Sequence, residues 1–275
     1  MVIAVDVGGT NLRAGRLDQD KIIVQKAIPL RDKEVLQKTI DQLVGLIRSV
    51  MDKDITGIGI GVPSVVDLEN GIVTDVTNIA SWKRVELKRI LEEEFKIPVR
   101  VNNDVNCFIL GEHRHGVVKG FKTVVGLAMG TGLGGGVIIN NELYAGKNCG
   151  AGEFGLVPYL DDCIENYCSS WFFHNKYNTT ALTAFQKAGE GDDEALKSWK
   201  EFGVHLGNAI KTVMYTYDPE AIVLGGSLSN GYKYFKDSMH EVMNTLAFPE
   251  SVKKLKLFVS DNPNIALLGA ASLIQ

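Results

Sequence analysis

The pattern of hydrophobic and polar positions divides the chain into two similar halves. The segment "VIAVDVGGTNLRAGRLDQDKIIVQKAI" (2–28) predicts an apolar strand, a glycine turn, a second strand, a polar turn and a third strand. The segment "TVVGLAMGTGLGGGVIINNELYAG" (123–146) has the same order of parts. Gly8 and Asp18 are ten residues apart, and so are Gly130 and Asn140. Two β-meanders that each open on a glycine turn predict two related domains.

Helical periodicity alternates with buried strands through the rest of the chain, which predicts an α/β protein with mixed sheets. Apolar residues at helical spacing predict helices, and short apolar runs beside turn residues predict strands. The predicted helices are 33–51, 85–96, 104–116, 192–217, 231–246 and 265–275, and the predicted strands are 55–63, 97–103, 221–225 and 256–260.

Composition narrows the class of protein. The 275 residues are enough for two domains, and 45% of them are hydrophobic. The 29 basic residues are outnumbered by 33 acidic ones, which argues against nucleic acid as the main partner. No apolar run reaches the roughly 18 residues that span a bilayer, and the first residues lack the features of a secretory signal. Four cysteines are too few for a disulfide scaffold. We therefore expect a soluble, cytoplasmic protein that does not contact a membrane.

The second glycine segment formally contains GxGxxG at Gly130, Gly132 and Gly135. A dinucleotide fingerprint would open a helix, but here an alternating strand follows, and GxxxxGK[ST] is not found. A hairpin tip alone needs only one or two glycines, whereas residues 130–136 contain five. Without Cβ atoms, backbone amides can approach phosphate oxygens closely, so we predict a phosphate-binding turn.

Asp6 ends the first apolar strand, where a carboxylate is costly unless something compensates it. Mg²⁺ would do so, since it uses one or two carboxylates together with water and substrate phosphates. The alternative is an aspartate that hydrogen-bonds the turn backbone. Ala128 occupies the aligned position of the second half, so only the first half offers this carboxylate. The two glycine turns and a third one, "VLGGS" (223–227), would together enclose a nucleoside triphosphate.

Asn103 and Asp104 stand where a predicted strand gives way to a helix. Either residue is an ordinary N-cap at such a junction. The functional alternative is a general base, because a carboxylate near a helix N-terminus stays ionised and can accept a hydroxyl proton. Phosphoryl transfer needs positioning, charge neutralisation and such a proton acceptor, so two phosphate turns in the same chain favour this second interpretation.

With these residues in place, the sequence resembles the ROK family of sugar kinases. The matches follow one another along nearly the whole chain. They are "DVGGTNLR" (6–13), "GIGVPSVVDLENGIV" (59–73), "NIASW" (78–82), "VNNDVNC" (101–107), "GTGLGGGVIINNELYAGKNCGAGEFG" (130–155), "AIVLGGSLS" (221–229) and "LLGAASL" (267–273).

The resemblance implies a glucokinase-like or N-acylhexosamine kinase-like enzyme of the actin-like ATPase (ribonuclease H-like) fold. A smaller domain would comprise residues 1–116 and the terminal helix 263–275, and a larger one residues 117–262. ATP and sugar would bind in the interdomain cleft, Mg²⁺ would be the metal cofactor, and a homodimer is a possible assembly.

The resemblance also assigns individual roles. Asp104 would be the catalytic base and a substrate contact, and Asp6 would bind Mg²⁺ through water. Sugar ligands would be Ser64, Thr77, Asn78, Asn103, Glu153 and Glu165. Nucleotide ligands would be Asp6, Gly8, Gly9, Thr10, Asn11, Arg13, Gly130, Thr131, Gly132, Gly225 and Gly226.

The sequence departs from the family at two features near the sugar ligands. The family continues with a histidine where this chain has Leu156, and its CxCG…GC zinc motif is reduced to Cys163. Ser64 replaces a usual glycine. Cys163, Cys168 and His174 lack the paired spacing of structural zinc sites, so we expect no zinc. Cys168 is better explained as a small buried hydrophobic residue.

Four functions therefore compete. The first is ATP-dependent phosphorylation of a hexose or amino sugar on a primary hydroxyl. The second is a sugar-responsive regulator, which would need a DNA-binding module ahead of the first strand; we expect none, because that strand starts at the N-terminus. The third is a chaperone or cytoskeletal ATPase, which would lack the pairs Asn103–Asp104 and Glu153–Glu165. The fourth is a sugar-binding protein of degenerate or unusual specificity, suggested by Leu156.

Overall fold

The computed structural model describes residues 1–274 and confirms the α/β class with mixed sheets. The chain forms two compact units. Unit 1 comprises Met1–Lys119, Leu143–Ala151 and the segment from Asn262 onward, and unit 2 comprises Gly120–Glu142 and Gly152–Asp261. Gln275, the last residue of the predicted terminal helix, lies outside the described residues.

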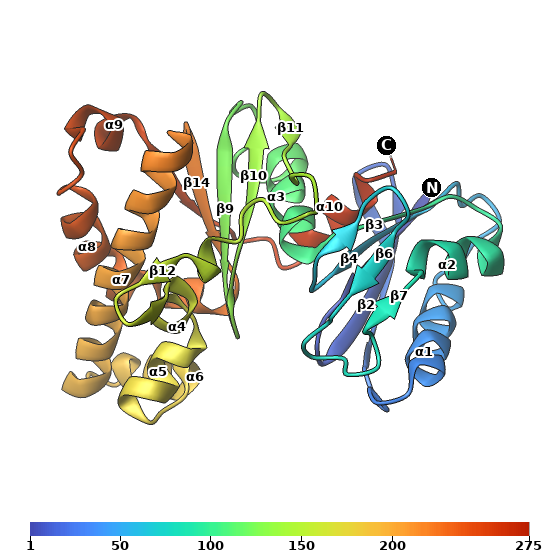
Figure 1. The fold of residues 1–275 in the computed structure, drawn as a ribbon, viewed down its shortest axis with the longest axis horizontal. Helices are drawn as coiled ribbons and strands as arrows, with labels where there is room; N and C mark the ends of the chain where they lie inside the picture. The colour runs from blue at the N-terminus through green and yellow to red at the C-terminus, as the bar shows by residue number, and fades with distance from the viewer. Residues whose placement is uncertain (275) are drawn as a thin grey trace. The chain divides into compact units, whose positions relative to one another are not determined.

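Unit 1 is built on a five-stranded sheet of order β3-β2-β1-β4-β8 (Figure 1). The β1–β2 and β2–β3 pairs are antiparallel, as the predicted meander requires, and the β1–β4 and β4–β8 pairs are parallel. The strands are β1 (Val2–Val7), β2 (Asn11–Asp18), β3 (Lys21–Pro29), β4 (Ile58–Val62) and β8 (Val99–Asn103), and a small separate sheet contains β5 (Val66–Asp67), β6 (Ile72–Thr74) and β7 (Arg84–Val85).

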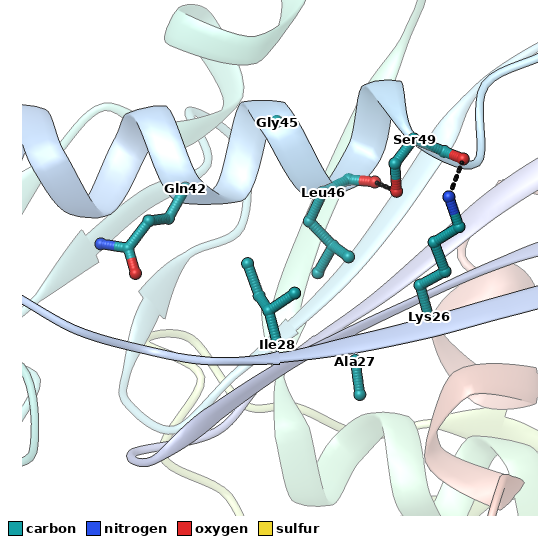
Figure 2. Close-up of a pocket in the computed structure, with 7 residues that line it drawn as sticks. All are labelled: Lys26, Ala27, Ile28, Gln42, Gly45, Leu46 and Ser49. Carbon is teal, nitrogen blue, oxygen red and sulfur yellow. Dashed lines mark hydrogen bonds between the residues drawn. The ribbon is translucent and has the colours of Figure 1, made fainter.

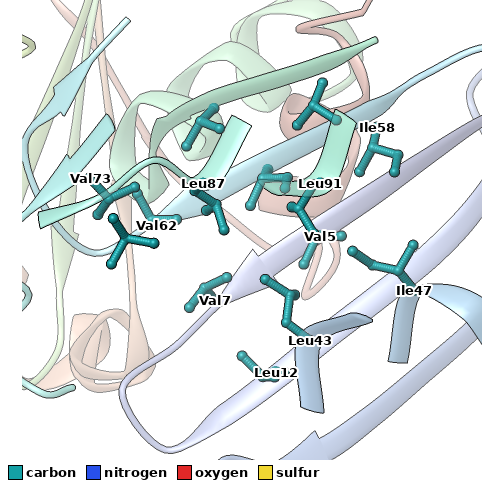
Figure 3. Packing of buried hydrophobic residues seen from close by; sticks show 14 of the residues in the cluster. Val5, Val7, Leu12, Leu43, Ile47, Ile58, Val62, Val73, Leu87 and Leu91 are labelled. Atoms are coloured by element: carbon teal, nitrogen blue, oxygen red, sulfur yellow. The ribbon is translucent and has the colours of Figure 1, made fainter. Parts of the chain in front are cut away.

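One face of this sheet is covered by α1 (Leu36–Arg48) and α2 (Leu87–Phe95). Figure 3 shows Leu43 and Ile47 of α1 directed toward Val5 of β1, in a fully buried apolar cluster. Burial of such side chains is the main favourable term in folding, and the amphipathic pattern of both helices follows from it.

The opposite face of the sheet is covered by α3 (Asp104–His115) and α10 (Ile265–Ala271). Side chains alternate along a strand, so the glycines of β4 all lie on this face. A Cβ on Gly59 would stand 1.8 Å from the carbonyl oxygen of Ala270, and one on Gly61 would stand 3.2 Å from Cys107 Sγ. A side chain at Gly59 would therefore clash with the backbone of α10, whereas one at Gly61 would require α3 to shift by a few tenths of an ångström.

Unit 2 repeats the plan with a sheet of order β11-β10-β9-β14-β15 (Figure 1). The β9–β10 pair is antiparallel and the β9–β14 and β14–β15 pairs are parallel. The predicted internal repeat is thus a repeat of topology. The strands are β9 (Val124–Met129), β10 (Leu133–Ile139), β11 (Glu142–Leu143), β14 (Ala221–Gly225) and β15 (Lys256–Val259), and a separate hairpin pairs β12 (Pro158–Tyr159) with β13 (Asp162–Cys163).

The long predicted helix of unit 2 is α7 (Asp193–Tyr217), which Asp192 caps by accepting a hydrogen bond from the Ala195 amide. It packs along α8 (Tyr232–Met243), and Trp199 and Phe202 are fully buried between aromatic neighbours. Periodicity did not predict the shorter helices. These are α4 (Ile164–Cys168), α5 (Ser170–Tyr177), α6 (Ala181–Gly189), α9 (Pro249–Lys254) and the 3₁₀ turns η1 (Phe154–Leu156) and η2 (Ser227–Gly231).

The segment Leu143–Ala151 folds with unit 1, whereas the predicted boundaries placed it in the C-terminal domain. Cys149 explains the difference: it is buried in the core of unit 1, with Sγ 3.5 Å from both Asn102 Oδ1 and Asn106 Nδ2. Cys149 also has a left-handed backbone conformation, φ 58°. A contact made across more than forty residues of sequence leaves no trace in local periodicity.

Among residues 1–274, no helix combines the length and the hydrophobicity needed to cross a membrane.

Candidate active site

Two of the predicted acidic residues meet at one edge of the unit 1 sheet. Asp6 is the register partner of Gly61, and a Cβ on Gly61 would stand 3.3 Å from the Asp104 Cα. Burial raises the pKa of the neighbouring Cys107 thiol well above its usual value, and the charges of Asp104 and Asp6 raise it further. Cys107 therefore stays a neutral thiol beneath two half-buried carboxylates.

Asn103, not Asp104, is the N-cap of α3. Its Oδ1 accepts hydrogen bonds from the amides of Val105 at 2.8 Å and Asn106 at 3.1 Å, and its Nδ2 donates to Ser64 O at 3.3 Å. Asp104 is the first helical residue, and its Oδ1 accepts from the Val105 amide at 2.9 Å. The capping role is thus satisfied without Asp104, whose carboxylate lies at the positive end of the helix dipole.

Asp6 forms an ion pair with Arg13. The guanidinium donates twice to Asp6 Oδ2, at 2.6 Å and 3.0 Å, and its remaining NH1 donates to Pro263 O at 3.0 Å. The sequence argument attributed the compensation of this carboxylate to Mg²⁺, but Arg13 already supplies it. Only Oδ2 of Asp6 takes part in the pair, so the carboxylate keeps capacity for a water-bridged cation.

The first glycine turn, residues 8–10, joins β1 to β2. The Gly8 amide donates to Asn11 O at 2.9 Å, and Asn11 Nδ2 donates to Thr10 Oγ1 at 3.2 Å. A Cβ on Gly9 would stand 2.7 Å from the Asn78 Cβ, so the turn packs against Asn78. Within the described residues no hydrogen bond engages the amides of Gly9 and Thr10, which leaves two donors for phosphate oxygens.

The sugar-side loop of unit 1 is tied to the same region. Ser64 Oγ donates to Thr74 O, and Ser64 O accepts from Asn103, so the serine that replaces the family's glycine joins β6 to the start of α3. Thr77 and Asn78 are exposed in the turn that precedes Ile79. Within unit 1, Asn103 thus joins the Ser64 loop to the start of α3, where Asp104 lies. A separate contact joins Gly9 of the first glycine turn to Asn78 of the sugar-side loop.

The second glycine turn, residues 130–132, joins β9 to β10 in unit 2. The Gly130 amide donates to Gly132 O at 2.9 Å. Over the part of the chain that is described, the amides of Thr131 and Gly132 make no hydrogen bond. This turn therefore offers the same kind of donor pair as the first one, as the sequence predicts for a phosphate site.

The third glycine turn follows β14. Gly226 has φ +81°, a conformation that side chains rarely adopt, and a Cβ there would stand 2.2 Å from Met129 O. Gly225 is the last residue of β14 and pairs with Ala128 of β9. Glycine is thus required at position 226 because the chain leaves β14 against the end of β9, next to the second glycine turn.

Unit 2 also brings together the two predicted sugar-binding glutamates. Glu165 lies in the first turn of α4, and its Oε2 accepts from the Leu133 amide at 2.8 Å. Burial, and then the charge of Glu165, raise the pKa of the Glu153 carboxyl above its usual value. A carboxyl whose pKa is raised by burial and by a second carboxylate is typical of a functional site.

The hairpin β12–β13, where the family has its zinc motif, is held by aromatic side chains. The rings of Tyr159 and Tyr167 are 5.3 Å apart, and those of Tyr167 and His205 are 4.8 Å apart. Tyr159 Oη lies 3.1 Å from His205 Nδ1 and accepts from Asn208 Nδ2 at 3.2 Å. Among residues 1–274, no group of three or more His, Cys, Asp or Glu is placed to hold a metal ion.

Leu156, the other departure from the family, lies in η1 with 64% of its surface exposed. It is three residues from Glu153, on the same short turn. An apolar side chain here supplies no hydrogen bond to a sugar hydroxyl, whereas a histidine could donate or accept one.

A groove of about 590 Å³ lies elsewhere in unit 1, between β3 and α1. Figure 2 shows Ile28 and Leu46 along it, with Lys26 Nζ donating to Ser49 O at 3.0 Å. None of the predicted site residues lines this groove, so it is separate from the candidate active site.

Two residues at the glycine turns were not predicted from the sequence. Lys33 is half-buried and its Nζ donates to Gly9 O. Ser170 donates from its amide to Gly130 O at 2.9 Å and from Oγ to Thr131 O at 3.2 Å. Neither belongs to a recognisable motif, and each reaches its turn over more than twenty residues of sequence.

Comparisons with known proteins identify the family of the chain. The ROK family model matches residues 2–275, so the chain belongs to the ROK family and the predicted resemblance is confirmed. The chain is 28% identical over 296 residues to an N-acetyl-D-glucosamine kinase of Photobacterium profundum, covering 96% of this chain and 93% of that protein. It is 29% identical over 254 residues to a xylose repressor of Caldicellulosiruptor bescii, covering 81% of this chain but 63% of the repressor.

The fold is similar to that of solved ROK structures. The crystal structure of a ROK family glucokinase from Streptomyces griseus, in complex with glucose and AMPPNP, has a TM-score of 0.84 and 25% identity, and 99% of this chain and 98% of that one are covered. This similarity confirms the predicted fold class.

Proposed function

We propose that this protein is an ATP-dependent sugar kinase in which Asp104 is the general base. The observation that carries the proposal is the division of roles at the start of α3: Asn103 caps the helix, and Asp104 follows it at the end of the sheet beside Asp6. Membership of the ROK family, and similarity to an N-acetyl-D-glucosamine kinase and a glucokinase, support the reaction class.

The proposed reaction transfers the γ-phosphoryl group of ATP to a primary hydroxyl of a hexose or amino sugar. Asp104 accepts the hydroxyl proton, the hydroxyl oxygen bonds to the γ-phosphorus, and the bond from that phosphorus to the β–γ bridging oxygen breaks, which releases ADP. Asp104 is the first residue of α3, where the helix dipole stabilises a negative charge.

The nucleotide would be held by the glycine turns. The unengaged amides of Gly9, Thr10, Thr131 and Gly132 would donate to phosphate oxygens, and such preorganised donors stabilise charge that develops in the transition state. Asn11 and Arg13 flank the first turn, and Gly225 and Gly226 would face the adenosine.

Mg²⁺ fits the chemistry of Asp6, because one carboxylate, water and substrate phosphates are the donor set that this ion uses. When bound, it would neutralise charge on the phosphates. Asp6 would hold it through water while Arg13 fixes the carboxylate.

The sugar would be bound by the two carboxylates of unit 2 and the loop residues of unit 1. Glu153 and Glu165 would accept hydrogen bonds from ring hydroxyls, and Ser64, Thr77, Asn78 and Asn103 would contribute from unit 1. Leu156 removes one polar contact, so we propose a substrate other than the one for which a histidine at this position is suited. A homodimer and a cytoplasmic location belong to the same proposal.

The test is coupled ADP release over a panel containing glucose, N-acetylglucosamine, N-acetylmannosamine, mannose, fructose and β-glucosides. We expect turnover on at least one sugar and a loss of about 10²- to 10⁴-fold in Asp104→Asn, since this is the usual contribution of a general base. Asp193→Asn is the matched control, because Asp193 is likewise the first residue of its helix, α7. Turnover in none of the sugars, or an equal loss in both variants, would refute the proposal.

The second candidate is a sugar-binding protein without efficient turnover. Similarity to a xylose repressor and the exposed Leu156 favour it. Thermal-shift measurements with the same sugars separate the two functions: a rise in melting temperature without ADP release supports binding alone.

A further inference from the structure

A short segment of unit 2, α4–α5 (164–177), holds the second glycine turn together with Leu133, the first residue of β10. Three hydrogen bonds join them. The Ser170 amide donates to Gly130 O at 2.9 Å, Ser170 Oγ donates to Thr131 O at 3.2 Å, and Glu165 Oε2 accepts from the Leu133 amide at 2.8 Å. The carbonyls of Gly130 and Thr131 therefore face the start of α5, and the two unengaged amides of the turn belong to Thr131 and Gly132.

Glu165 is packed tightly against this turn. A Cβ on Gly132 would stand 2.4 Å from Glu165 Oε2, and one on Gly155 would stand 3.4 Å from the Glu165 Cβ. Its second oxygen, Oε1, makes no hydrogen bond within residues 1–274. One oxygen of the carboxylate thus holds the amide that follows the glycine turn, and the other is left for a ligand.

We propose that Ser170 and Glu165 are positioning residues of the phosphate-binding turn, and that Glu165 couples sugar binding to ATP binding. The coupling rests on the proposed function, whereas the positioning rests only on contacts within unit 2. A sugar hydroxyl that binds Oε1 fixes the rotamer of Glu165, and the fixed Oε2 holds the Leu133 amide and the amides beside it. Binding of the sugar therefore lowers the conformational-entropy cost of ordering the phosphate-binding turn for ATP, and binding of ATP lowers the cost of ordering Glu165 for the sugar.

The positioning role is tested without sugar, by calorimetric titration of the full chain with Mg²⁺-AMPPNP. Ser170→Ala removes the hydroxyl that holds Thr131 O, and we expect affinity to fall about three- to tenfold, as for loss of one hydrogen bond. Ser169→Ala is the matched control: Ser169 is the N-cap of α5, where its Oγ accepts from the Trp171 amide at 3.2 Å, but within residues 1–274 its side chain makes no hydrogen bond to the turn. Ser170→Thr should restore affinity.

If Ser170 only stabilised the fold, Ser170→Ala and Ser169→Ala would both lower the melting temperature and the AMPPNP affinity together. The proposal expects instead that Ser169→Ala lowers the melting temperature but keeps AMPPNP affinity within about twofold. AMPPNP affinity unchanged in Ser170→Ala, or equally reduced in Ser169→Ala, would overturn the positioning role.

The coupling is tested by repeating the titration with saturating glucose or N-acetylglucosamine. For at least one of the two sugars, we expect the wild-type protein to bind AMPPNP about five- to fiftyfold more tightly than without sugar, the usual range of coupling between sites. This ratio should approach one in Glu165→Asp, which is too short to reach Leu133, and in Gly132→Ala, whose new Cβ displaces the carboxylate. Glu165→Gln keeps an acceptor oxygen, so it should keep AMPPNP affinity and lose sugar affinity.

A ratio of one in the wild-type protein for both sugars, or a ratio unchanged in Glu165→Asp, would overturn the coupling. Failure of the proposed function has a different signature: no sugar supports ADP release, while the Ser170 and Ser169 variants still differ in AMPPNP affinity.

Discussion

Gly61 lies directly against Asp104: a Cβ on Gly61 would stand 3.3 Å from the Asp104 Cα and 3.2 Å from Cys107 Sγ. The glycine therefore sets how closely the first turn of α3 approaches β4. Since Gly61 is also the register partner of Asp6, this one position fixes the separation of the two carboxylates.

Gly61→Ala should lower kcat strongly and leave the protein folded. The added methyl group displaces the start of α3 by a few tenths of an ångström, and misplaced catalytic groups lose rate steeply, so we expect kcat to fall about tenfold or more. Overpacking should cost about 1–3 kcal/mol in the free energy of unfolding. Coupled ADP release and denaturant unfolding measure the two effects.

Gly45→Ala is the control for that substitution, because nothing lies within 4 Å of a Cβ at Gly45 on α1. It should keep full activity. Equal activity in the two variants would show that the position of Asp104 is not set by Gly61.

Asp6→Asn should change the magnesium dependence of the reaction. The amide no longer attracts hydrated Mg²⁺, so we expect a higher half-saturating Mg²⁺ concentration and about a 10- to 100-fold loss of activity. It also leaves Arg13 without its ion-pair partner, at a cost of about 1 kcal/mol in this half-buried position. Titration of activity with Mg²⁺ measures the first effect and thermal unfolding the second.

Asp52→Asn is matched to it, because Asp52 forms an ion pair with Arg16 on the same strand as Arg13. We expect this variant to keep the wild-type Mg²⁺ dependence. A wild-type dependence in Asp6→Asn as well would refute the metal role of Asp6.

Glu153→Gln should raise the melting temperature at neutral pH and reduce sugar binding. Burial and the charge of Glu165 raise the pKa of Glu153, so the folded protein binds a proton more readily than the unfolded chain. Stability from this group is therefore present at low pH and lost as pH rises through the raised pKa. Burial of the carboxyl is incomplete, because Glu153 keeps more than a third of its surface exposed, and water screens the effect, so we expect a gain of no more than about 2 °C.

Thermal unfolding of the wild-type protein and of Glu153→Gln at pH 4 and pH 7.5 checks this expectation. The gain should be confined to pH 7.5, where the wild-type carboxylate is ionised. A gain of the same size at both values would show that charge is not its cause.

His205 should make the protein less stable in mild acid. Burial lowers its pKa, which Glu201 opposes and Lys176 reinforces, so the unfolded chain takes up a proton near pH 6.5 while the folded protein resists it. Stability from this group is present above pH 6.5 and lost as pH falls below that value. We expect a loss of about 1–3 °C in melting temperature between pH 7 and pH 5.5 that His205→Gln removes.

His174→Gln is the control, since His174 is an exposed histidine of the same unit. It should keep the wild-type pH dependence. If it reduces that dependence as much as His205→Gln does, the acid sensitivity does not come from the buried ring.

Local sequence patterns determined the strands of the two five-stranded sheets, the long helices and the three glycine turns, but not the short strands of the two small sheets. Alternation in 2–28 and 123–146 predicted both meanders, because a half-buried strand buries every second side chain. The helix that begins at Asp104 was predicted from apolar spacing and its N-terminal residues. These features depend on residues close together in the chain, and so does the choice of glycine where a strand turns sharply.

Only the tertiary structure decided which partners the functional residues have. Arg13 rather than a metal ion alone compensates Asp6, Ser170 holds the second glycine turn, and Cys149 draws residues 143–151 into unit 1. Periodicity and motif spacing describe neighbours along one element, whereas these contacts join elements that only folding brings together. The sequence thus determined where the proposed catalytic groups stand along the chain, and packing decided how each one is held.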